Sequence, residues 1–122
     1  MNLLLDTHTF VWWDNARLPA SVTKRIQRAD AVFLSAVVAW EIAIKSSVGK
    51  MTAKGRVADA IADYGFTPLP IQLSHADAVR SLPALHRDPF DRMLVAQALV
   101  EDLVIVSADE ALSAYNVPVV WS

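Results

Sequence analysis

Residues 2–6, Asn2-Leu3-Leu4-Leu5-Asp6, are a short run of leucines that ends on an acid. A continuous apolar run of this length is typical of a strand that is buried on both faces of a parallel sheet. Residues 31–34 and 103–106 are two further runs of this kind. Helix-forming stretches lie between the runs, so strands and helices alternate along the chain. This alternation predicts an α/β fold whose central, mostly parallel sheet of about four to five strands is flanked by helices.

Caps and helix breakers place the other elements. Ser35 is a good N-cap for a helix that Gly49 stops, and Asp88-Pro89 opens another helix because proline is favoured at the first helical position. Two prolines indicate that residues 66–71 form an edge strand or a poorly paired one. Helices are expected over about residues 21–28, 36–47, 56–64, 74–82, 89–102 and 109–115. Strands are expected over residues 2–5, 31–34, 66–71, 103–106 and 117–121.

Length and composition narrow the class of protein. The chain has 122 residues, which suits one domain over residues 1–122. No apolar run approaches the roughly 18–20 residues needed to cross a bilayer, so we expect no membrane association. The absence of cysteine excludes disulfides and thiolate metal sites and fits a reducing cytoplasm, the location we expect. A net charge of -2 does not by itself indicate a nucleic-acid binder.

Acidic residues follow the predicted strands. Asp6 comes directly after the first apolar run, and Asp109 lies just beyond the run at 103–106. Ligands in open α/β sheets bind at the carboxyl ends of the strands, so both acids are expected at the same edge. Glu41 lies in the second turn of the helix that leaves this edge, among apolar neighbours. A carboxylate there is costly to bury unless a cation or hydrogen-bond donors compensate it.

The segment His86-Arg87-Asp88-Pro89-Phe90-Asp91-Arg92 supplies the fourth acid. We interpret Asp88 as the N-cap of the helix and Asp91, three residues on, as the functional acid. Acids gathered in this way repel one another, and a divalent cation removes that repulsion. An all-oxygen ligand set favours Mg²⁺ or Mn²⁺, whereas zinc is disfavoured because the three histidines show no ligand spacing. His8 could contact substrate phosphate or could be purely structural.

Each of the other acids also has a structural interpretation. Asp6 could cap the turn into residues 9–13, and Asp109 could cap the short helix that follows it. Glu41 could pair with Lys45, four residues further along the same helix. The convergence of all the acids on one edge favours the functional interpretation over these alternatives.

Four segments carry a resemblance to a known family. They are Leu3-Leu4-Leu5-Asp6-Thr7-His8, Trp40-Glu41-Ile42-Ala43-Ile44-Lys45, residues 86–92 running on into Ala96-Gln97-Ala98, and Val104-Ile105-Val106-Ser107-Ala108-Asp109. With these segments, which extend over nearly the whole chain, the protein resembles the PIN-domain ribonucleases, specifically the VapC toxins of bacterial type II toxin–antitoxin systems. Any one segment is weak evidence, but the four in this order and spacing are specific.

The resemblance implies a toxic endoribonuclease. Asp6, Glu41, Asp91 and Asp109 would hold Mg²⁺, or Mn²⁺, for the hydrolysis of RNA phosphodiesters. Ser107 occupies a position that is often Thr in relatives and keeps the hydroxyl as a supporting partner of the site. The resemblance further implies a homodimer and a cognate antitoxin that silences the enzyme.

Two expectations concern the surfaces of such a toxin. Lys45, Arg87 and Arg92 are expected to ring the acidic pocket. The hydrophobic share of 54% indicates that apolar surface is buried against a second copy or the antitoxin. Trp12 and Trp13 are expected to be part of that surface.

Two other functions remain open. An aspartyl phosphatase or a phosphorelay receiver, both of them Mg²⁺-dependent, also places an Asp after its first strand. The phosphatase signature has a second acid two residues later, where this chain has His8, and a receiver needs a lysine after a later strand, which residues 103–106 lack. The other alternative is a catalytically silent PIN-like module that only binds RNA or protein. The four intact acids count against it.

Overall fold

The computed structural model describes residues 1–51 and 54–121, and its centre is a five-stranded parallel sheet with the order β3-β2-β1-β4-β5. The strands are β1 (Asn2–Leu5), β2 (Ala31–Ser35), β3 (Thr67–Leu69), β4 (Val104–Val106) and β5 (Val119–Val120). The helices are α1 (Thr7–Asp14), α2 (Ala20–Gln27), α3 (Ala36–Ser47), α4 (Val57–Tyr64), α5 (Leu73–Val79), α6 (Pro89–Glu101) and the 3-10 helix η1 (Glu110–Tyr115). The predicted α/β class is confirmed.

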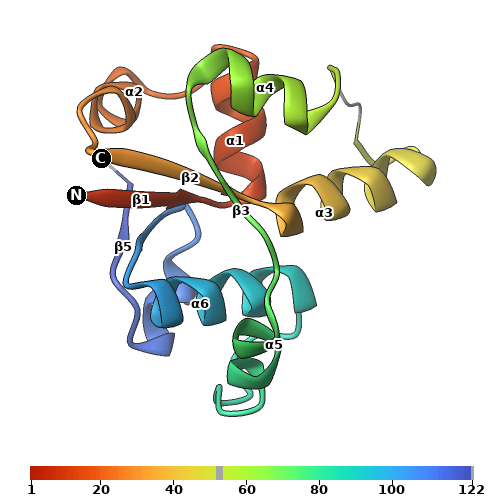
Figure 1. Ribbon diagram of the computed structural model, residues 1–122, viewed down its shortest axis with the longest axis vertical. Coiled ribbons are helices and arrows are strands. Elements are labelled where there is room, and N and C mark those ends of the chain that lie inside the picture. The colour runs from red at the N-terminus through yellow and green to blue at the C-terminus, as the bar shows by residue number, and fades with distance from the viewer. Residues whose placement is uncertain (52–53, 122) are drawn as a thin grey trace.

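Helices cover both faces of the sheet, with α1, α2 and α4 on one side and α5 and α6 on the other (Figure 1). Within β1, Leu3 and Leu5 pack into one hydrophobic cluster and Leu4 packs into the other. All three leucines have no exposed surface. An uninterrupted apolar strand is therefore the right sequence for this position, because each of its faces meets a separate core.

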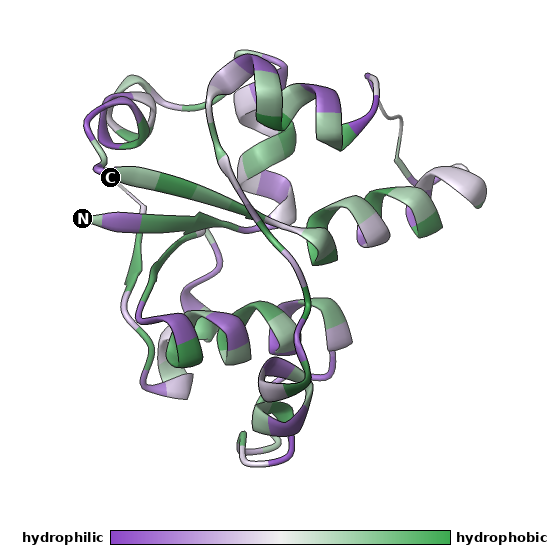
Figure 2. Cartoon of the chain, viewed as in Figure 1, coloured by the Kyte–Doolittle hydropathy of each residue, from purple (hydrophilic) through white to green (hydrophobic). Residues whose placement is uncertain are grey.

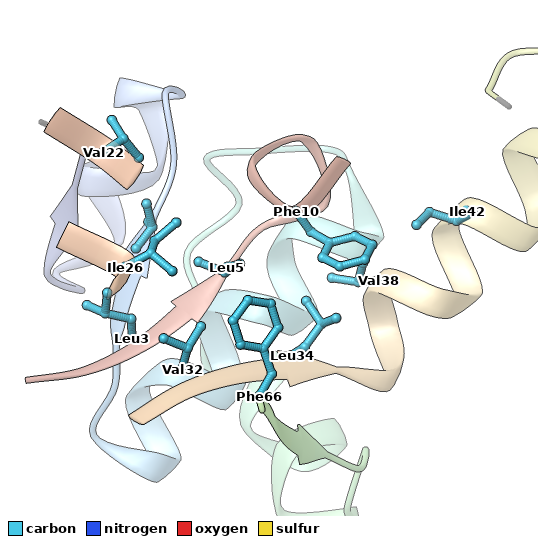
Figure 3. Packing of buried hydrophobic residues seen from close by; sticks show 11 residues of the cluster. Leu3, Leu5, Phe10, Val22, Ile26, Val32, Leu34, Val38, Ile42 and Phe66 are labelled. Carbon is cyan, nitrogen blue, oxygen red and sulfur yellow. The ribbon is translucent and has the colours of Figure 1, made fainter. Parts of the chain in front are cut away.

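The first cluster joins β1 and β2 to α1, α2 and α3 (Figure 3). Phe10 of α1 and Val38 of α3 lie side by side above the sheet, and Phe66, just before β3, reaches the same cluster. The second cluster lies between the sheet and α6 and includes side chains from η1. Figure 2 shows the apolar colour concentrated on the strands, whereas most helices carry both apolar and polar colours.

The helix α1 and the strands β3 and β5 differ from the expectation. Residues 7–14 form the helix α1, whereas the sequence suggested only a turn after Asp6. The segment contains β-branched and aromatic residues that have modest helix propensity, so its local sequence does not predict a helix. The burial of Phe10 and the cap formed by Asp6 stabilise the helix instead. The expected strands at 66–71 and 117–121 are present but shorter, with three and two residues.

A buried polar network fastens α6 to the sheet. Gln97 has no exposed surface, and its Oε1 accepts a hydrogen bond at 2.6 Å from the hydroxyl of Ser35, the N-cap of α3. Its amide nitrogen lies 3.3 Å from the carbonyl oxygen of Pro70 and 3.3 Å from Nδ1 of the fully buried His75. One side chain thus connects the end of β2, the end of β3 and α5.

The exposed apolar surface lies only partly where the sequence analysis placed it, because Trp12 is exposed but Trp13 is half-buried. Trp13 is only partly exposed and packs against Phe66 in the first cluster, with ring centroids 5.7 Å apart, so it belongs largely to the core. Trp40, Ile44 and Val48 are also exposed and lie four residues apart along α3 and its C-cap. This helix projects beyond the sheet (Figure 1). No helix in residues 1–51 or 54–121 combines the length and the apolar character that a membrane span requires.

Candidate functional site

The ends of β1 and β4 bring Asp6 and Asp109 to the same edge of the sheet. Leu5 pairs with Val106, and the backbone N–H of Asp6 donates to the carbonyl of Val106 at 3.3 Å. Each acid is also a helix N-cap: Oδ1 of Asp6 accepts from the N–H of Thr9 at 2.9 Å, and Oδ1 of Asp109 accepts from the N–H of Ala111 at 3.0 Å. The capping and functional interpretations are compatible, since each cap uses one carboxylate oxygen.

Glu41 is buried, with an exposed fraction of 3%, on the inner side of α3. Its Oε1 accepts a hydrogen bond from the hydroxyl of Thr7, the first residue of α1. Its Oε2 is paired with the ammonium of Lys45, one helical turn further along α3. The ion pair considered from the sequence is therefore present. The hydroxyl of Thr7 was not anticipated, because nothing in the local sequence shows that α1 and α3 meet here.

Asp91 is the site acid whose pKa is clearly shifted from its ordinary value. The pKa of Asp91 is raised to about 7, and burial is the largest cause. The negative charges of Asp88, Asp6 and Glu41 contribute to this shift, whereas His86 opposes it. Asp6, which follows β1, and Glu41, on α3, are therefore close enough to Asp91 on α6 to repel its negative charge. The structure thus gathers the predicted acids at one edge.

Asp88 caps α6 and also lies near the acids. Its Oδ1 accepts hydrogen bonds from the N–H groups of Phe90 at 2.8 Å and Asp91 at 3.2 Å, as expected of an N-cap. Its charge also helps to raise the pKa of Asp91, and it attracts Lys45. The hydrogen bond to Glu41 raises the pKa of Lys45, and Asp88 and Asp91 contribute to the same shift, although burial opposes it. One ammonium group therefore faces several of the carboxylates.

His86 is a site residue that the sequence analysis set aside. Its Nε2 lies 3.5 Å from an oxygen of Asp91 and 3.4 Å from an oxygen of Asp109, and these three atoms form a potential metal-ligating group. However, Nδ1 of His86 accepts the backbone N–H of Asp88 at 3.1 Å. The network therefore assigns the proton of the neutral ring to Nε2, so His86 faces the two carboxylates as a donor rather than as a metal ligand.

Other residues named from the sequence have mainly structural contacts. The hydroxyl of Ser107 accepts the N–H of Asp109 at 3.0 Å and so orients that acid from a buried position. His8 is exposed and packs its ring near Trp12. Arg92 does not ring the pocket as expected: its guanidinium donates to the carbonyl of Pro83 at 2.8 Å and lies over the ring of Tyr115. It anchors the loop before α6.

The chemistry of this site fits a divalent cation. The site contains the carboxylates of the four predicted acids and that of Asp88. Two side chains that favour negative charge, Lys45 and His86, lie beside them. Burial is the largest cause of the raised pKa of Asp91, and the negative charges of Asp88, Asp6 and Glu41 add to it despite the opposing effect of His86. Hard oxygen donors with excess negative charge are the ligands that Mg²⁺ and Mn²⁺ prefer. A cation held here could bind and polarise a phosphate group at the open edge of the sheet.

Comparison with known proteins agrees with the fold and the motifs. Ribonuclease VapC22 of Mycobacterium tuberculosis is 26% identical over 126 residues, which cover 95% of this chain and 93% of the relative. The structure of the VapBC2 complex of Rickettsia felis, bound to a DNA fragment from its promoter, contains a chain that superposes with a TM-score of 0.73 at 16% identity, covering 98% of both chains. A chain of the DNA-bound VapBC complex of Salmonella typhimurium gives a TM-score of 0.73 at 14% identity and covers 98% of this chain and 97% of its own. The family model for the PIN domain matches residues 3–118, and this chain therefore belongs to the PIN domain family.

Proposed function

We propose that this protein is a metal-dependent endoribonuclease of the VapC type, the toxin of a type II toxin–antitoxin pair, with residues 1–122 acting as one catalytic domain. The observation that carries the proposal is the meeting of Asp6, Glu41 and Asp91, from three separate segments of a PIN fold, closely enough that the charges of Asp6 and Glu41 add to the effect of burial on the pKa of Asp91. The similarity to Ribonuclease VapC22 supports the choice of RNA as substrate.

The proposed ligands of Mg²⁺ or Mn²⁺ are Asp6, Glu41, Asp91 and Asp109. A bound ion would supply a Lewis acid that neutralises phosphate charge and makes a water molecule more acidic. The protein supports this chemistry by orienting the acids. Caps fix one oxygen each of Asp6 and Asp109, and Ser107 holds the backbone of Asp109. Because the site lies at the edge of the sheet, unpaired RNA is the expected substrate, as single strands and loops expose their bases and backbone.

Two protein partners belong to the proposal. Several of the similar solved structures are VapBC complexes, which supports a cognate antitoxin that binds this chain. A homodimer is supported by the exposed apolar side chains of Trp40, Ile44 and Val48, because a protruding helix with such a stripe buries it favourably against a second copy.

The test is cleavage of single-stranded RNA by the purified chain in Mg²⁺ or Mn²⁺, in EDTA, and after the metal is restored. We expect cleavage with either metal, none in EDTA and full recovery on restoration. Cleavage that persists in EDTA would disprove the metal mechanism. RNA binding without cleavage in any metal would favour the catalytically silent PIN-like module instead.

A further inference from the structure

The ammonium of Lys45 is paired with one oxygen of Glu41 and lies near other acids of the cluster. This ammonium contacts Oε2, while the hydroxyl of Thr7 engages Oε1, so both oxygens of this buried carboxylate have partners. The side chain of Lys45 is 28% exposed, against 4% for Glu41, so one end of the ion pair is open to solvent. Asp88 and Asp91 also attract the same ammonium.

We propose that Lys45 exchanges partners during the reaction: it compensates Glu41 when no divalent ion is present, leaves when the ion enters, and then binds a phosphate of the RNA. This inference rests on the proposed function and adds a residue to it. Lys45 would be a counter-cation in one state and a substrate-binding residue in the other.

The first half follows from the electrostatics of burial. A buried carboxylate is costly unless a cation compensates its charge. Glu41 therefore needs the ammonium of Lys45 when no metal is bound, and the metal can take over this role when it binds. An ammonium group that stays at Oε2 repels a divalent ion bound to the same carboxylate, since like charges at contact distance repel strongly where water is partly excluded. Metal binding through Glu41 therefore favours the departure of Lys45, while Thr7 can keep its hydrogen bond to the other oxygen.

The second half follows from the position of Lys45 on α3. It lies one turn beyond Glu41, on the solvent side of the pair, and its four-carbon stem can swing without any movement of the helix. Asp88 and Asp91 keep the released ammonium near the metal. A phosphate that binds the metal brings negative charge to that place, and an ammonium is a suitable point-charge donor for it.

The experiment compares Lys45→Met and Lys45→Gln with Lys50→Met. Methionine keeps the apolar stem, glutamine keeps a donor for Glu41, and both remove the charge. Lys50 is exposed and follows the end of the same helix, so it controls for a general loss of positive charge. Binding of Mn²⁺ to the RNA-free protein is measured by electron paramagnetic resonance, and kcat and KM are measured on single-stranded RNA at saturating Mg²⁺.

We expect both Lys45 variants to bind Mn²⁺ about threefold to tenfold more tightly than the wild type and to raise KM for RNA several-fold. Lys50→Met should keep the Mn²⁺ affinity within about twofold of the wild-type value, because the charge of Lys50 is exposed and therefore screened by solvent and salt. Unchanged Mn²⁺ affinity in both Lys45 variants would overturn the exchange. Tighter Mn²⁺ binding with an unchanged KM would also overturn it, since Lys45 would then be only a counter-cation.

The wild-type protein separates this result from failure of the proposed function. If the wild type binds Mn²⁺ and cleaves RNA while the Lys45 variants behave like it, only the inference about Lys45 fails. If the wild type neither binds Mn²⁺ nor cleaves RNA, the proposed function itself fails, and the partner exchange fails with it.

Discussion

Asp88 and Asp91 are three residues apart at the start of α6, but their oxygen atoms have different neighbours. Asp88 uses Oδ1 to cap the helix, whereas Asp91 faces the other acids and His86. We expect Asp91→Asn to reduce RNA cleavage by at least about 100-fold, because it removes a charge from the proposed metal site. Asp88→Asn should keep activity within about tenfold, since asparagine is an equally good N-cap.

The measurement is RNA cleavage at equal concentrations of folded protein, with circular dichroism and thermal unfolding to show that both variants keep the fold. If Asp88→Asn is as inactive as Asp91→Asn, then Asp88 is part of the metal site and not only its neighbour.

The raised pKa of Asp91 also predicts how stability changes with pH in the metal-free protein. Its folded-state pKa of about 7 lies above the ordinary value of 3.8, so the folded protein holds this proton more tightly than the unfolded chain does. The stabilisation is fully present below pH 4 and is lost as the pH rises through 7. With EDTA present, the melting temperature of the wild type should fall as the pH rises from 4 to 7. This fall should exceed that of Asp91→Asn over the same pH range by about 4 °C or more. Parallel pH profiles for the two proteins would contradict this.

The four acids of the candidate site were predicted from the sequence, because each lies near the end of a strand or the start of a helix, where local patterns are informative. The contacts of His86 and Thr7 were not assigned in advance, since they depend on how α1, α3 and α6 meet, whereas the pairing of Lys45 with Glu41 was considered because the two are four residues apart on one helix. His86 reaches Asp109, which lies far along the chain, so no spacing rule within one segment could find the pair. The metal and the roles of the acids stay predictions until they are tested.

At the scale of elements, Gln97 offers a test of what holds α6 in place. Gln97→Met keeps the volume but leaves the hydroxyl of Ser35 without its acceptor and the carbonyl of Pro70 without its donor. We expect a loss of about 1–3 kcal/mol in the free energy of unfolding, measured by urea denaturation. Leu99→Met, on the exposed side of the same helix, should change it by less than about 0.5 kcal/mol. Equal values for the two variants would show that the network contributes little to stability.

The elements predicted best were those with two agreeing signals. For α6, an N-cap aspartate and a proline at the first position gave the correct start at Pro89. For β1 and β4, apolar runs gave strands close to the expected limits. The helix α1 was missed because its stability comes from contacts with α3 and from the first core cluster rather than from its own residues. The ends of β5 depend on how much of β4 is available to pair with it. The local sequence of β5 carries no information about that length.

At the scale of the whole molecule, the stripe of apolar side chains on α3 predicts self-association. Ile44→Glu places a charge in the middle of the stripe, so it should shift the protein toward the monomer at tens of micromolar. Leu73→Glu, at a more exposed apolar position on α5, is the matched control and should leave the oligomeric state unchanged. Light scattering coupled to size exclusion measures both. A wild-type protein that is already monomeric under these conditions would rule out this homodimer.

The strand order has a consequence for the synthesis of the protein on the ribosome. The innermost strand, β1, is made first, but its neighbour β4 begins only at Val104, and Asp109 comes later still (Figure 1). On the ribosome, the growing chain exposes one edge of β1 until β4 has been translated. Asp6, Glu41 and Asp91 precede β4 in the sequence, whereas Asp109 follows it. The four proposed metal ligands therefore cannot come together before β4 and Asp109 have been made.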